Sequence, residues 1–291
     1  MTLPSNRALI AKLDNMIHDC LKDYIGNDEP LAILDFPDIR NCGDSAIWLG
    51  EMAYLDRRYG KRPTYVSRID DFSPEQLERT MPTGPIFIHG GGNFGDIWDA
   101  HQDFRERVLE RFPDRQVIQF PQSIHYKSQA RLDESARAIG RHKNFVLLVR
   151  DEESKEFAHK HFDCEVRLCP DMAFSIGAIQ PEEPQFPVLA MLRSDLEKVG
   201  DANLQAYPDI PKEDWTTESA KRVRISKALG AATALLALKP AEIRLRKLDA
   251  AAHNRLRRGI RQISRGQALV TDRLHVHICS ILLGRPHAVL D

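Results

Sequence analysis

Short apolar runs that alternate with amphipathic stretches are the feature that most limits how this chain can fold. Stretches with helical periodicity lie at about 7–23, 44–58, 101–112, 131–140 and 151–161. Between them stand runs that are nearly all apolar or β-branched, at 31–36, 64–67, 85–89, 116–120, 145–149 and 165–168. Strands without a polar face are typical of a parallel sheet that helices cover on both sides. The pattern therefore predicts an α/β fold.

The pattern changes after residue 178. Residues 180–187 (QPEEPQFP) hold three prolines and two glutamates, which is typical of a linker. Two α/β domains are therefore expected, at residues 1–178 and 188–291. For the second, the sequence predicts a strand at 188–192, an irregular acidic stretch to about 216, helices between 217 and 264, a strand at 267–271, a helix at 273–283 and a final strand.

The second domain is small for a doubly wound fold. It lacks an obvious middle strand unless Leu235–Leu238 supplies one. The chain also stops at Asp291, directly after an expected strand, where a doubly wound domain would continue into a closing helix. We therefore expect a second domain that is truncated at its carboxyl end.

The charge of the chain is balanced overall but unevenly distributed. The chain has 41 Lys and Arg and 42 Asp and Glu, so its net charge indicates no nucleic-acid partner. Residues 221–265, however, carry 13 Lys and Arg and only two acids, Glu242 and Asp249. Such a block forms either a solvated helix face or a face that lies against anionic lipid or a phosphorylated carrier.

The number and spacing of the cysteines and the hydropathy of the chain indicate its cellular compartment. Its five cysteines are odd in number and never spaced C-x-x-C, which argues against a disulfide framework or a closed zinc site and favours a reducing cytosol. The start of the chain lacks the apolar block of a signal peptide. The longest apolar run, residues 231–238, is far short of the ~20 residues of a spanning helix. We expect a cytoplasmic protein, soluble or peripheral to the inner face of the plasma membrane.

Ligands of open parallel sheets bind beyond the carboxyl ends of the strands, and a glycine-rich segment follows one of the strands here. Residues 89–96 (HGGGNFGD) include Gly91, Gly92 and Asn93, and the glycines expose backbone N–H groups that suit an anion or a sugar. The segment is neither G-x-G-x-x-G nor a P-loop. The alternative is a tight turn between strand and helix.

Two further loops combine a polar group with the start of a helix. Asp44 and Ser45 follow the first strand and either cap the next helix or contact a ligand, and a helix N-terminus attracts phosphate or carboxylate in both cases. Arg150 follows the fifth strand. It either forms an ion pair with Asp151 or presents its planar guanidinium to a carboxylate or phosphate.

A cluster of basic side chains stands near the end of the chain, after strand 267–271. Arg273, His275 and His277 splay around the first turns of the helix expected there. The helix dipole disfavours cations at this end, so an arginine and a histidine here favour an anionic ligand over a purely structural role. His277 lies between two core-like residues, and we expect it to be packed or to cap the helix.

Other catalytic patterns are absent from the sequence. The chain has no G-x-S-x-G, no H-E-x-x-H and no D-x-D of the type that holds a metal–nucleotide-sugar complex. Scattered histidines show no ligand spacing beyond isolated pairs, so no metal site is expected; they stand at positions 101, 125, 142, 159, 161 and 253.

Six short motifs occur in one order along the chain, and together they resemble the polysaccharide pyruvyl transferase family. Each motif is weak alone, but six in register are fairly specific, and the match runs from about residue 35 to the end. The motifs are N-x-G-D at 41–44, H-G-G-G-N at 89–93, P-Q-S at 121–123, R-D-x-x-S at 150–154, P-D at 170–171 and D-R-x-H at 272–275.

The resemblance implies a GT-B-like fold, in which two Rossmann-type domains face each other across a cleft. It also implies transfer of a pyruvyl group from phosphoenolpyruvate (PEP) to a sugar of an exopolysaccharide repeat unit or its precursor, with a cyclic ketal formed and phosphate released. PEP is then a co-substrate, and no other cofactor and no metal is implied. The PEP-binding arginines and histidine of the family carry over to Arg150, Arg273 and His275.

The chemistry of these residue types fits that implication. PEP is a small trianion near neutral pH, and two arginines can neutralise most of its charge through bidentate bonds. We expect Arg273 to hold the phosphate or carboxylate and Arg150 the other anionic group. His275 is the expected general acid, which protonates C3 while a sugar hydroxyl attacks C2. The rest of the expected binding site is Asp44, Gly91, Gly92 and Asn93.

Two other functions stay open on the residues alone. Arg273 and His275 would serve a nucleotide pyrophosphate nearly as well, as in a GT-B glycosyltransferase that uses a nucleotide sugar. The chain could also be a non-catalytic sugar-binding subunit of a polymer-assembly complex. In the favoured interpretation the acceptor is an oligosaccharide on a lipid-phosphate carrier, and residues 221–265 dock on the anionic membrane that holds it.

Overall fold

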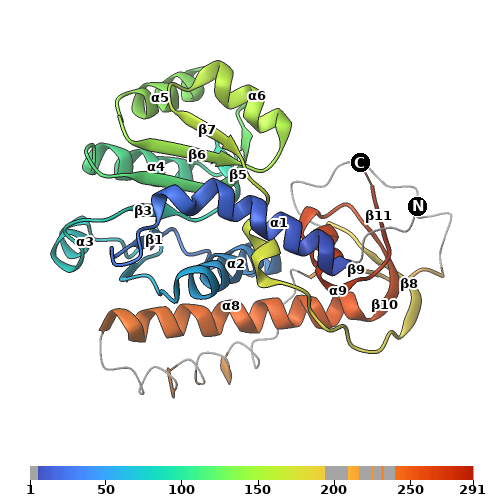
Figure 1. The fold of residues 1–291 in the computed structure, drawn as a ribbon. Helices are drawn as coiled ribbons and strands as arrows, with labels where there is room; N and C mark the ends of the chain where they lie inside the picture. Colours follow the sequence, from blue (N-terminus) through green and yellow to red (C-terminus); the bar gives the residue numbers. More distant parts are fainter. Residues whose placement is uncertain are drawn as a thin grey trace.

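The computed structural model describes residues 6–193, 209–215 and 240–290, with a few single positions between 224 and 232. Its strands form two sheets, and each strand pairing described in them is parallel. The larger sheet and its helices lie to the left in Figure 1, and the smaller sheet lies to the right. The predicted α/β fold with parallel strands is therefore confirmed.

The larger sheet has the strand order β2-β1-β3-β5-β6-β7, and β4 pairs with β5 beside this path. All six strands that the sequence predicts for this part of the chain are present. The strands are β1 (Ala32–Leu34), β2 (Tyr65–Val66), β3 (Ile86–Ile88), β4 (Gly91–Gly95), β5 (Val117–His125), β6 (Phe145–Val149) and β7 (Glu165–Leu168).

The glycine-rich segment after β3 differs from its prediction, because part of it forms strand β4 rather than a loop or turn. Gly91 and Gly95 have φ angles of 138° and 118°, which glycine adopts easily and other residues do not. A Cβ on Gly95 would lie 1.8 Å from the carbonyl oxygen of His125, so the close approach of β4 to β5 requires glycine. β5 extends to His125, beyond its predicted end at 120, and pairs with β4 there.

Strands β1, β3 and β6 of the larger sheet are apolar along their whole length because both of their faces are buried. Ile33 and Phe87 belong to a hydrophobic cluster with α1 (Asn6–Leu21) and α2 (Cys42–Tyr59). Their neighbours Leu34 and Ile88 point the other way and belong to a second cluster. The helices of that second cluster are α3 (Pro74–Thr80), α4 (Asp99–Arg111), α5 (Gln129–Gly140) and α6 (Glu152–His161).

The smaller sheet has the strand order β11-β10-β8-β9. Two predictions are wrong here: β8 begins inside the expected linker 180–187, and the stretch expected to be irregular contains β9, which pairs with the end of β8. The middle strand expected at 235–238 lies outside the described residues. The elements of this part are β8 (Phe186–Met191), β9 (Lys212–Glu213), α8 (Pro240–Ser264), β10 (Gly266–Thr271), α9 (Leu274–Leu283) and β11 (His287–Val289).

The long helix α8 runs along α2 and connects the two sheets (Figure 1). The indole Nε1 of Trp48 on α2 donates a 2.8 Å hydrogen bond to Oδ1 of Asp249 on α8. A Cβ on Gly259 would lie 2.9 Å from the side chain of Cys42, so the two helices pack closely. One hydrophobic cluster therefore continues from the larger sheet through both helices to β8, β10 and α9.

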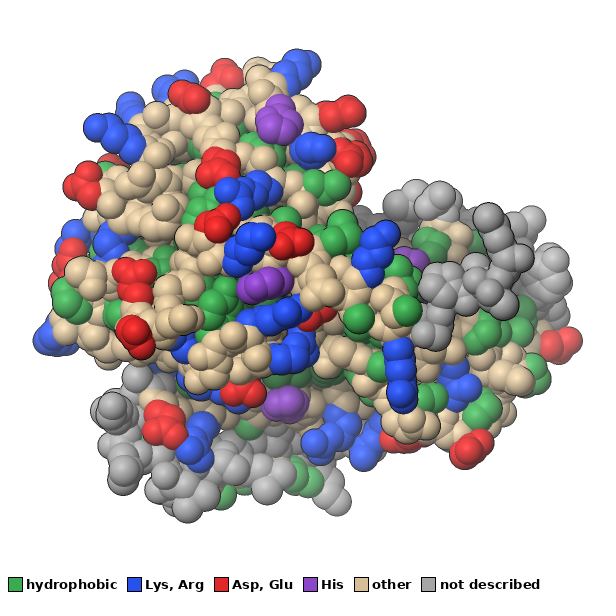
Figure 2. Space-filling model, viewed as in Figure 1, with side chains coloured by type: hydrophobic (Ala, Val, Ile, Leu, Met, Phe, Trp, Pro, Cys, Tyr) green, Lys and Arg blue, Asp and Glu red, His purple; other side chains and the backbone are tan. Residues whose placement is uncertain are grey.

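Most of the residues that the structure describes in the basic block 221–265 belong to α8. Arginines of this helix form ion pairs with acidic residues in loops of the larger sheet. Arg244 forms an ion pair with Asp71, and Arg255 forms one with Asp38. These pairs hold α8 against the loops after β1 and β2, a role that the sequence does not reveal. Basic and acidic side chains are interspersed over the face shown in Figure 2. Among the described helices, none is both long and apolar enough to cross a membrane.

Candidate active site

A cavity of about 660 Å³ lies at the carboxyl ends of strands from both sheets. Its lining comes from β4 and from segments that follow β1, β2, β3, β4, β6, β8, β9 and β10. This is the edge at which parallel α/β sheets bind ligands. The predicted site residues that line the cavity are Asp44, Gly92, Asn93, Arg150, Arg273 and His275, while Gly91 is not part of the lining.

Arg150 reaches the cavity from the end of β6. Its Nη1 donates to Oδ2 of Asp171 at 2.7 Å, and its Nε donates to the hydroxyl of Ser123 at 3.0 Å. Its Nη2 makes no hydrogen bond within the described part of the chain. The alternative ion pair with Asp151 is not formed, because that carboxylate caps α6 by accepting a hydrogen bond from the backbone N–H of Ser154.

Asp171 connects Arg150 to His275. Asp171 caps the short helix η2 (Met172–Ile176), because its Oδ1 accepts a 2.9 Å hydrogen bond from the backbone N–H of Ala173. Its Oδ2 lies 3.4 Å from Nε2 of His275, which is an ion-pair contact without hydrogen-bond geometry. Burial alone would raise the pKa of Asp171, but the neighbouring His275 and Arg150 outweigh burial and hold that pKa well below its ordinary range.

Arg273 reaches the cavity from the smaller sheet, at the N-cap position of α9. Its Nη2 donates to Oδ2 of Asp214 at 2.8 Å. The Asp214 carboxylate offsets the cost of a cation at this helix N-terminus, so the dipole argument for an anionic ligand does not hold by itself. Asp214 was not predicted as a site residue, because the sequence does not reveal β9, the strand that precedes it.

The N-terminus of α2 lies against His275. A Cβ on Gly43 would fall 2.6 Å from the imidazole ring, so this close approach requires glycine. Asn41 caps the helix, since its Oδ1 accepts a 3.0 Å hydrogen bond from the backbone N–H of Gly43. The alternative in which Asp44 or Ser45 caps α2 is therefore wrong, and Asp44 lines the cavity instead.

His89 and Glu51 form a buried pair beside the glycine-rich segment. Nδ1 of His89 lies 2.9 Å from Oε1 of Glu51, which also accepts a 3.1 Å hydrogen bond from the backbone N–H of Gly90. Burial by itself lowers the pKa of His89, but the charge of Glu51 outweighs it, and the pKa is raised. His89 lines the cavity, and its Nε2 has no hydrogen-bond partner among the described residues. Glu51 was not predicted as a site residue, because it lies in the middle of α2 and not at the end of a strand.

Asn93 both lines the cavity and anchors β4. Its Oδ1 accepts hydrogen bonds from Nη2 of Arg105 at 3.0 Å and from Nε2 of Gln122 at 2.9 Å. Its backbone N–H donates to Oε1 of Gln122 at 3.2 Å. Arg105 is fully buried, and this burial lowers its pKa to about 10. The network holds the glycine-rich strand at a fixed position beside the cavity.

Asp35 and His101 form another carboxylate–histidine pair in the cavity lining. Nδ1 of His101 lies 2.9 Å from both carboxylate oxygens of Asp35. Asp35 is the one non-glycine residue of the described chain with a positive φ, 68°, which is a strained conformation of the kind that clusters at functional sites. This pair was not predicted from the sequence. The available signal was an acid near the end of the apolar run 31–36.

His277 lies outside the cavity lining. Its Nδ1 is 2.6 Å from Nε2 of His287, and burial lowers its pKa. The prediction that His277 is packed is confirmed, and the N-cap alternative is wrong because Arg273 occupies that position. Within the described ranges, no three His, Cys, Asp or Glu side chains are grouped as metal ligands.

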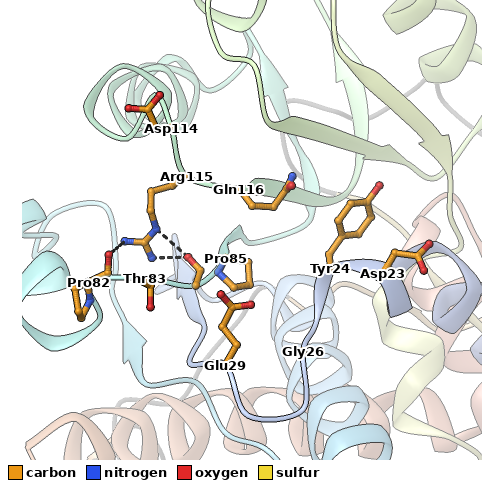
Figure 3. A pocket seen from close by; sticks show the side chains of 11 residues that line it. Asp23, Tyr24, Gly26, Glu29, Pro82, Thr83, Pro85, Asp114, Arg115 and Gln116 are labelled. Atoms are coloured by element: carbon orange, nitrogen blue, oxygen red, sulfur yellow. Dashed lines mark hydrogen bonds between the residues drawn. The ribbon is translucent and has the colours of Figure 1, made fainter.

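A second cavity, of about 450 Å³, lies next to the residues that precede β3 and β5. Figure 3 shows Arg115 there, with its guanidinium donating to the carbonyl oxygens of Pro82 and Gly84. Backbone oxygens thus already engage this arginine. Since parallel sheets bind ligands at the opposite strand ends, this cavity is not the candidate active site.

Comparison with known proteins agrees with these motifs. The model of the family described as polysaccharide pyruvyl transferase matches residues 41–291. Pyruvyl transferase 1 of Schizosaccharomyces pombe is 29% identical over 297 residues, which cover 99% of this chain and 72% of that protein. EpsO of Bacillus subtilis, to which its name ascribes a pyruvyl transferase role, is 28% identical over 277 residues, which cover 93% of this chain and 84% of that one.

A solved structure has the same fold. It is that of a functionally uncharacterised protein of Klebsiella pneumoniae, with a TM-score of 0.58 and 18% sequence identity over 98% of this chain and 88% of that one. At this identity the likeness concerns the fold alone. Because the family model covers most of the sequence, the chain belongs to the polysaccharide pyruvyl transferase family and is an enzyme of that kind.

Proposed function

We propose that this enzyme transfers the pyruvyl group of PEP to two hydroxyls of one sugar in an exopolysaccharide repeat unit or its precursor, which forms a cyclic ketal and releases phosphate. The observation that carries the proposal is that Arg150, Arg273 and His275 line one cavity although they follow strands of different sheets. Two guanidinium groups and an imidazole suit a small donor that carries a carboxylate and a phosphate.

Both arginines are oriented by carboxylates of the chain itself. Asp171 accepts from Arg150 at 2.7 Å, and Asp214 accepts from Arg273 at 2.8 Å. A guanidinium has five N–H donors, and the Nη2 group of Arg150 makes no hydrogen bond within the described part of the chain. We assign Nη2 of Arg150 to one anionic group of PEP and Arg273 to the other. Gly92 keeps this approach open, because a Cβ there would lie 3.3 Å from that Nη2.

We assign the remainder of the donor site to β4 and to the start of α2. Backbone N–H groups at a helix N-terminus favour an anion, and the N-terminus of α2 lies beside His275. Gly91, Gly92 and Asn93 border the donor in this proposal. The Asp44 carboxylate, which would repel the anionic groups of PEP, accepts hydrogen bonds from hydroxyls of the acceptor.

The proposed transfer consists of two additions at C2 of PEP. His275 donates a proton to C3 while the first sugar hydroxyl attacks C2, and the proton of that hydroxyl returns to the imidazole. The bond between C2 and the phosphate oxygen then breaks, and the second hydroxyl adds to C2. Its proton leaves with phosphate. PEP is the co-substrate in this scheme, which requires no other cofactor and no metal.

His275 is held in one orientation from two sides, as this step requires. The Asp171 carboxylate lies 3.4 Å from Nε2, and Gly43 packs against the ring. Proton transfer to a carbon atom depends on such fixed geometry, because the acid has to lie within reach of one atom of the donor.

The proposal also covers the domain arrangement of the chain and its place in the cell. The two sheets correspond to Rossmann-type domains of a GT-B-like fold, residues 1–178 and 188–291, with the cavity between them. The acceptor is carried by a lipid phosphate at the inner face of the plasma membrane, and the basic block 221–265 contacts anionic lipid there. Exposed Lys247 and Arg257 on α8 support this contact. Binding to anionic vesicles that persists after both are changed to Glu would contradict it.

Thermal unfolding with ligands tests the donor assignment. A ligand that binds only the folded chain raises its Tm. We expect millimolar PEP to raise the Tm by a few degrees, UDP and GDP to leave it unchanged, and Arg273→Ala to lose the response. The control variant Arg261→Ala removes an exposed arginine of α8 outside the cavity lining and should keep it.

His275→Ala separates the acid role from binding. PEP should stabilise this variant about as much as the wild type, while phosphate release falls by ~10²-fold or more. If His275→Ala lost its stabilisation by PEP to the same extent as its turnover, His275 would not be the general acid. If UDP or GDP raised the Tm and PEP did not, the result would instead support a glycosyltransferase. If none of these ligands changed the Tm, it would support a sugar-binding subunit.

A further inference from the structure

Exposed apolar side chains line the same cavity as the arginines. Seven large hydrophobic residues are exposed in the described chain, and three of them, Ile39, Trp98 and Leu274, belong to the cavity lining. The side chain of Trp98 is 47% exposed, whereas Trp48 and Trp215 are buried. An exposed indole is unfavourable in water, and exposed apolar groups gathered at a cavity are typical of a binding surface. A ligand that covers Trp98 would remove this cost.

Trp98 is fixed in position by the backbone around it. Trp98 is the N-cap residue of α4, and its carbonyl oxygen accepts a 3.0 Å hydrogen bond from the backbone N–H of His101 in the first turn of that helix. The preceding Gly95 donates its backbone N–H to Oε1 of Gln102 at 3.1 Å. The indole is therefore presented by an ordered helix start, so a ligand that packs on it meets a pre-formed surface.

Polar groups lie next to this aromatic surface. His101 stands one turn after Trp98 on α4, is held by Asp35, and lines the same cavity. A sugar ring has matching needs, because its C–H groups pack on an aromatic face while its hydroxyls require hydrogen-bond partners. The combination of an exposed indole and a carboxylate–histidine pair therefore fits a pyranose better than it fits a purely apolar group.

We propose that Trp98 is the stacking platform for the acceptor sugar, and that it positions the ring so that two of its hydroxyls face the donor site. This inference rests on the proposed function, because it places the acceptor of that reaction. A cavity of about 660 Å³ has room for a small donor and one sugar ring together. Trp98 is thus a specificity-determining residue that acts on acceptor binding rather than on PEP.

The three tryptophans allow a direct binding test that needs no turnover. Trp98 is exposed and the other two are buried, so acrylamide should quench the fluorescence of Trp98 selectively. We expect methyl galactosides, mannosides or glucosides at high concentration to protect Trp98 from quenching. Trp98→Phe keeps only the buried tryptophans and should show no such protection, which assigns the signal to residue 98.

Acceptor kinetics give a second, independent measurement. Trp98→Ala should raise the KM for the acceptor about tenfold, which corresponds to ~1.4 kcal/mol, with a smaller change in kcat. Trp98→Phe should restore most of the loss because it keeps an aromatic face. PEP should stabilise both variants as it stabilises the wild type. Met16→Ala, which removes an exposed apolar side chain outside the cavity lining, is the matched control and should change neither quantity.

The outcomes separate this inference from the proposed function. If PEP stabilises the chain but no glycoside in the panel protects Trp98 from quenching, the platform role is wrong and the donor assignment stands. If UDP or GDP protects Trp98 and PEP has no effect, the indole stacks on a nucleobase, and both proposals are wrong. An unchanged acceptor KM in Trp98→Ala would also overturn the platform role.

Discussion

Arg150 and Asp171 form a 2.7 Å ion pair in which both side chains are almost completely buried. The carboxylate oxygen that accepts from Arg150 also lies 3.4 Å from Nε2 of His275. One carboxylate therefore faces two basic groups, one from each sheet. Because the proposed PEP-binding arginine and the proposed general acid share this partner, a change at Asp171 should alter donor binding and proton transfer together.

Removal of the Asp171 charge is expected to destabilise the fold and the site. Asp171→Asn leaves the largely buried Arg150 guanidinium without its counter-charge, which should cost about 3 kcal/mol in the free energy of unfolding. Urea unfolding at neutral pH measures this loss. Asp19→Asn, at an exposed surface ion pair, is the control and should leave the free energy of unfolding almost unchanged, because water and salt screen exposed pairs.

The pH dependence of this loss follows from the lowered pKa of Asp171. The ionised carboxylate stabilises the folded chain above its unfolded-state pKa of about 3.9, and this contribution is lost as the pH falls through the lower folded-state pKa. The stability difference between wild type and Asp171→Asn should therefore be complete at neutral pH and shrink in strong acid. A difference that grows on acidification would show that Asp171 is not held ionised.

Gly43→Ala should impair catalysis more than folding. Alanine in the first turn of α2 favours a helix over glycine by up to about 1 kcal/mol. A Cβ at this position, however, would lie 2.6 Å from the ring of His275 and would displace it. We expect phosphate release from PEP to fall at least tenfold while the Tm changes little.

The control for this variant is Gly26→Ala, where the nearest atom to an added Cβ, on Glu29, is 3.4 Å away. It should retain activity. Full activity of Gly43→Ala would mean that the orientation of His275 is not limiting.

The buried pair of His89 and Glu51 should give a pH-dependent contribution of the opposite sign to that of Asp171. The folded-state pKa of His89 is raised above its unfolded value of about 6.5. Its stabilising contribution is therefore complete below about pH 6.5 and is lost as the pH rises through the folded-state pKa. We expect the stability difference between wild type and His89→Gln to be larger near pH 6 than near pH 9.

His142 provides a matched control for the His89 measurement. Burial lowers its pKa, so protonation favours the unfolded chain, and the wild type loses stability as the pH falls below about 6.5. The difference between wild type and His142→Gln should thus grow with rising pH. Equal pH profiles for the two histidine variants would contradict the ion pair of His89.

Much of the fold can be predicted from local patterns of the sequence. Six of the seven strands described in the larger sheet were predictable, because neighbouring residues such as Ile33 and Leu34 are both apolar although they point to opposite faces, as in a sheet covered on both sides. Loops at the carboxyl ends of such strands are natural ligand sites, which is why Arg150, Arg273 and His275 could be selected before their positions were known.

Short elements of the smaller sheet were less accessible to such reasoning. β9 has two residues, Lys212 and Glu213, and no apolar pattern, and among the described residues it pairs with the end of β8. Likewise, β4 depends on glycines that adopt a positive φ beside β5. The sequence of β4 therefore resembles that of a loop. In both cases a neighbouring strand, and not the segment itself, decides the structure.

The sequence by itself determined the parallel α/β fold, the segments that carry polar groups and the family to which the chain belongs. Only the tertiary structure decided which charges meet: Asp171 with Arg150 and His275, and Asp214 with Arg273. Periodicity and capping act over a few residues, so they can be read along the chain. An ion pair depends on distances of a few ångströms between segments far apart in sequence, and those distances exist only after the helices and sheets have packed.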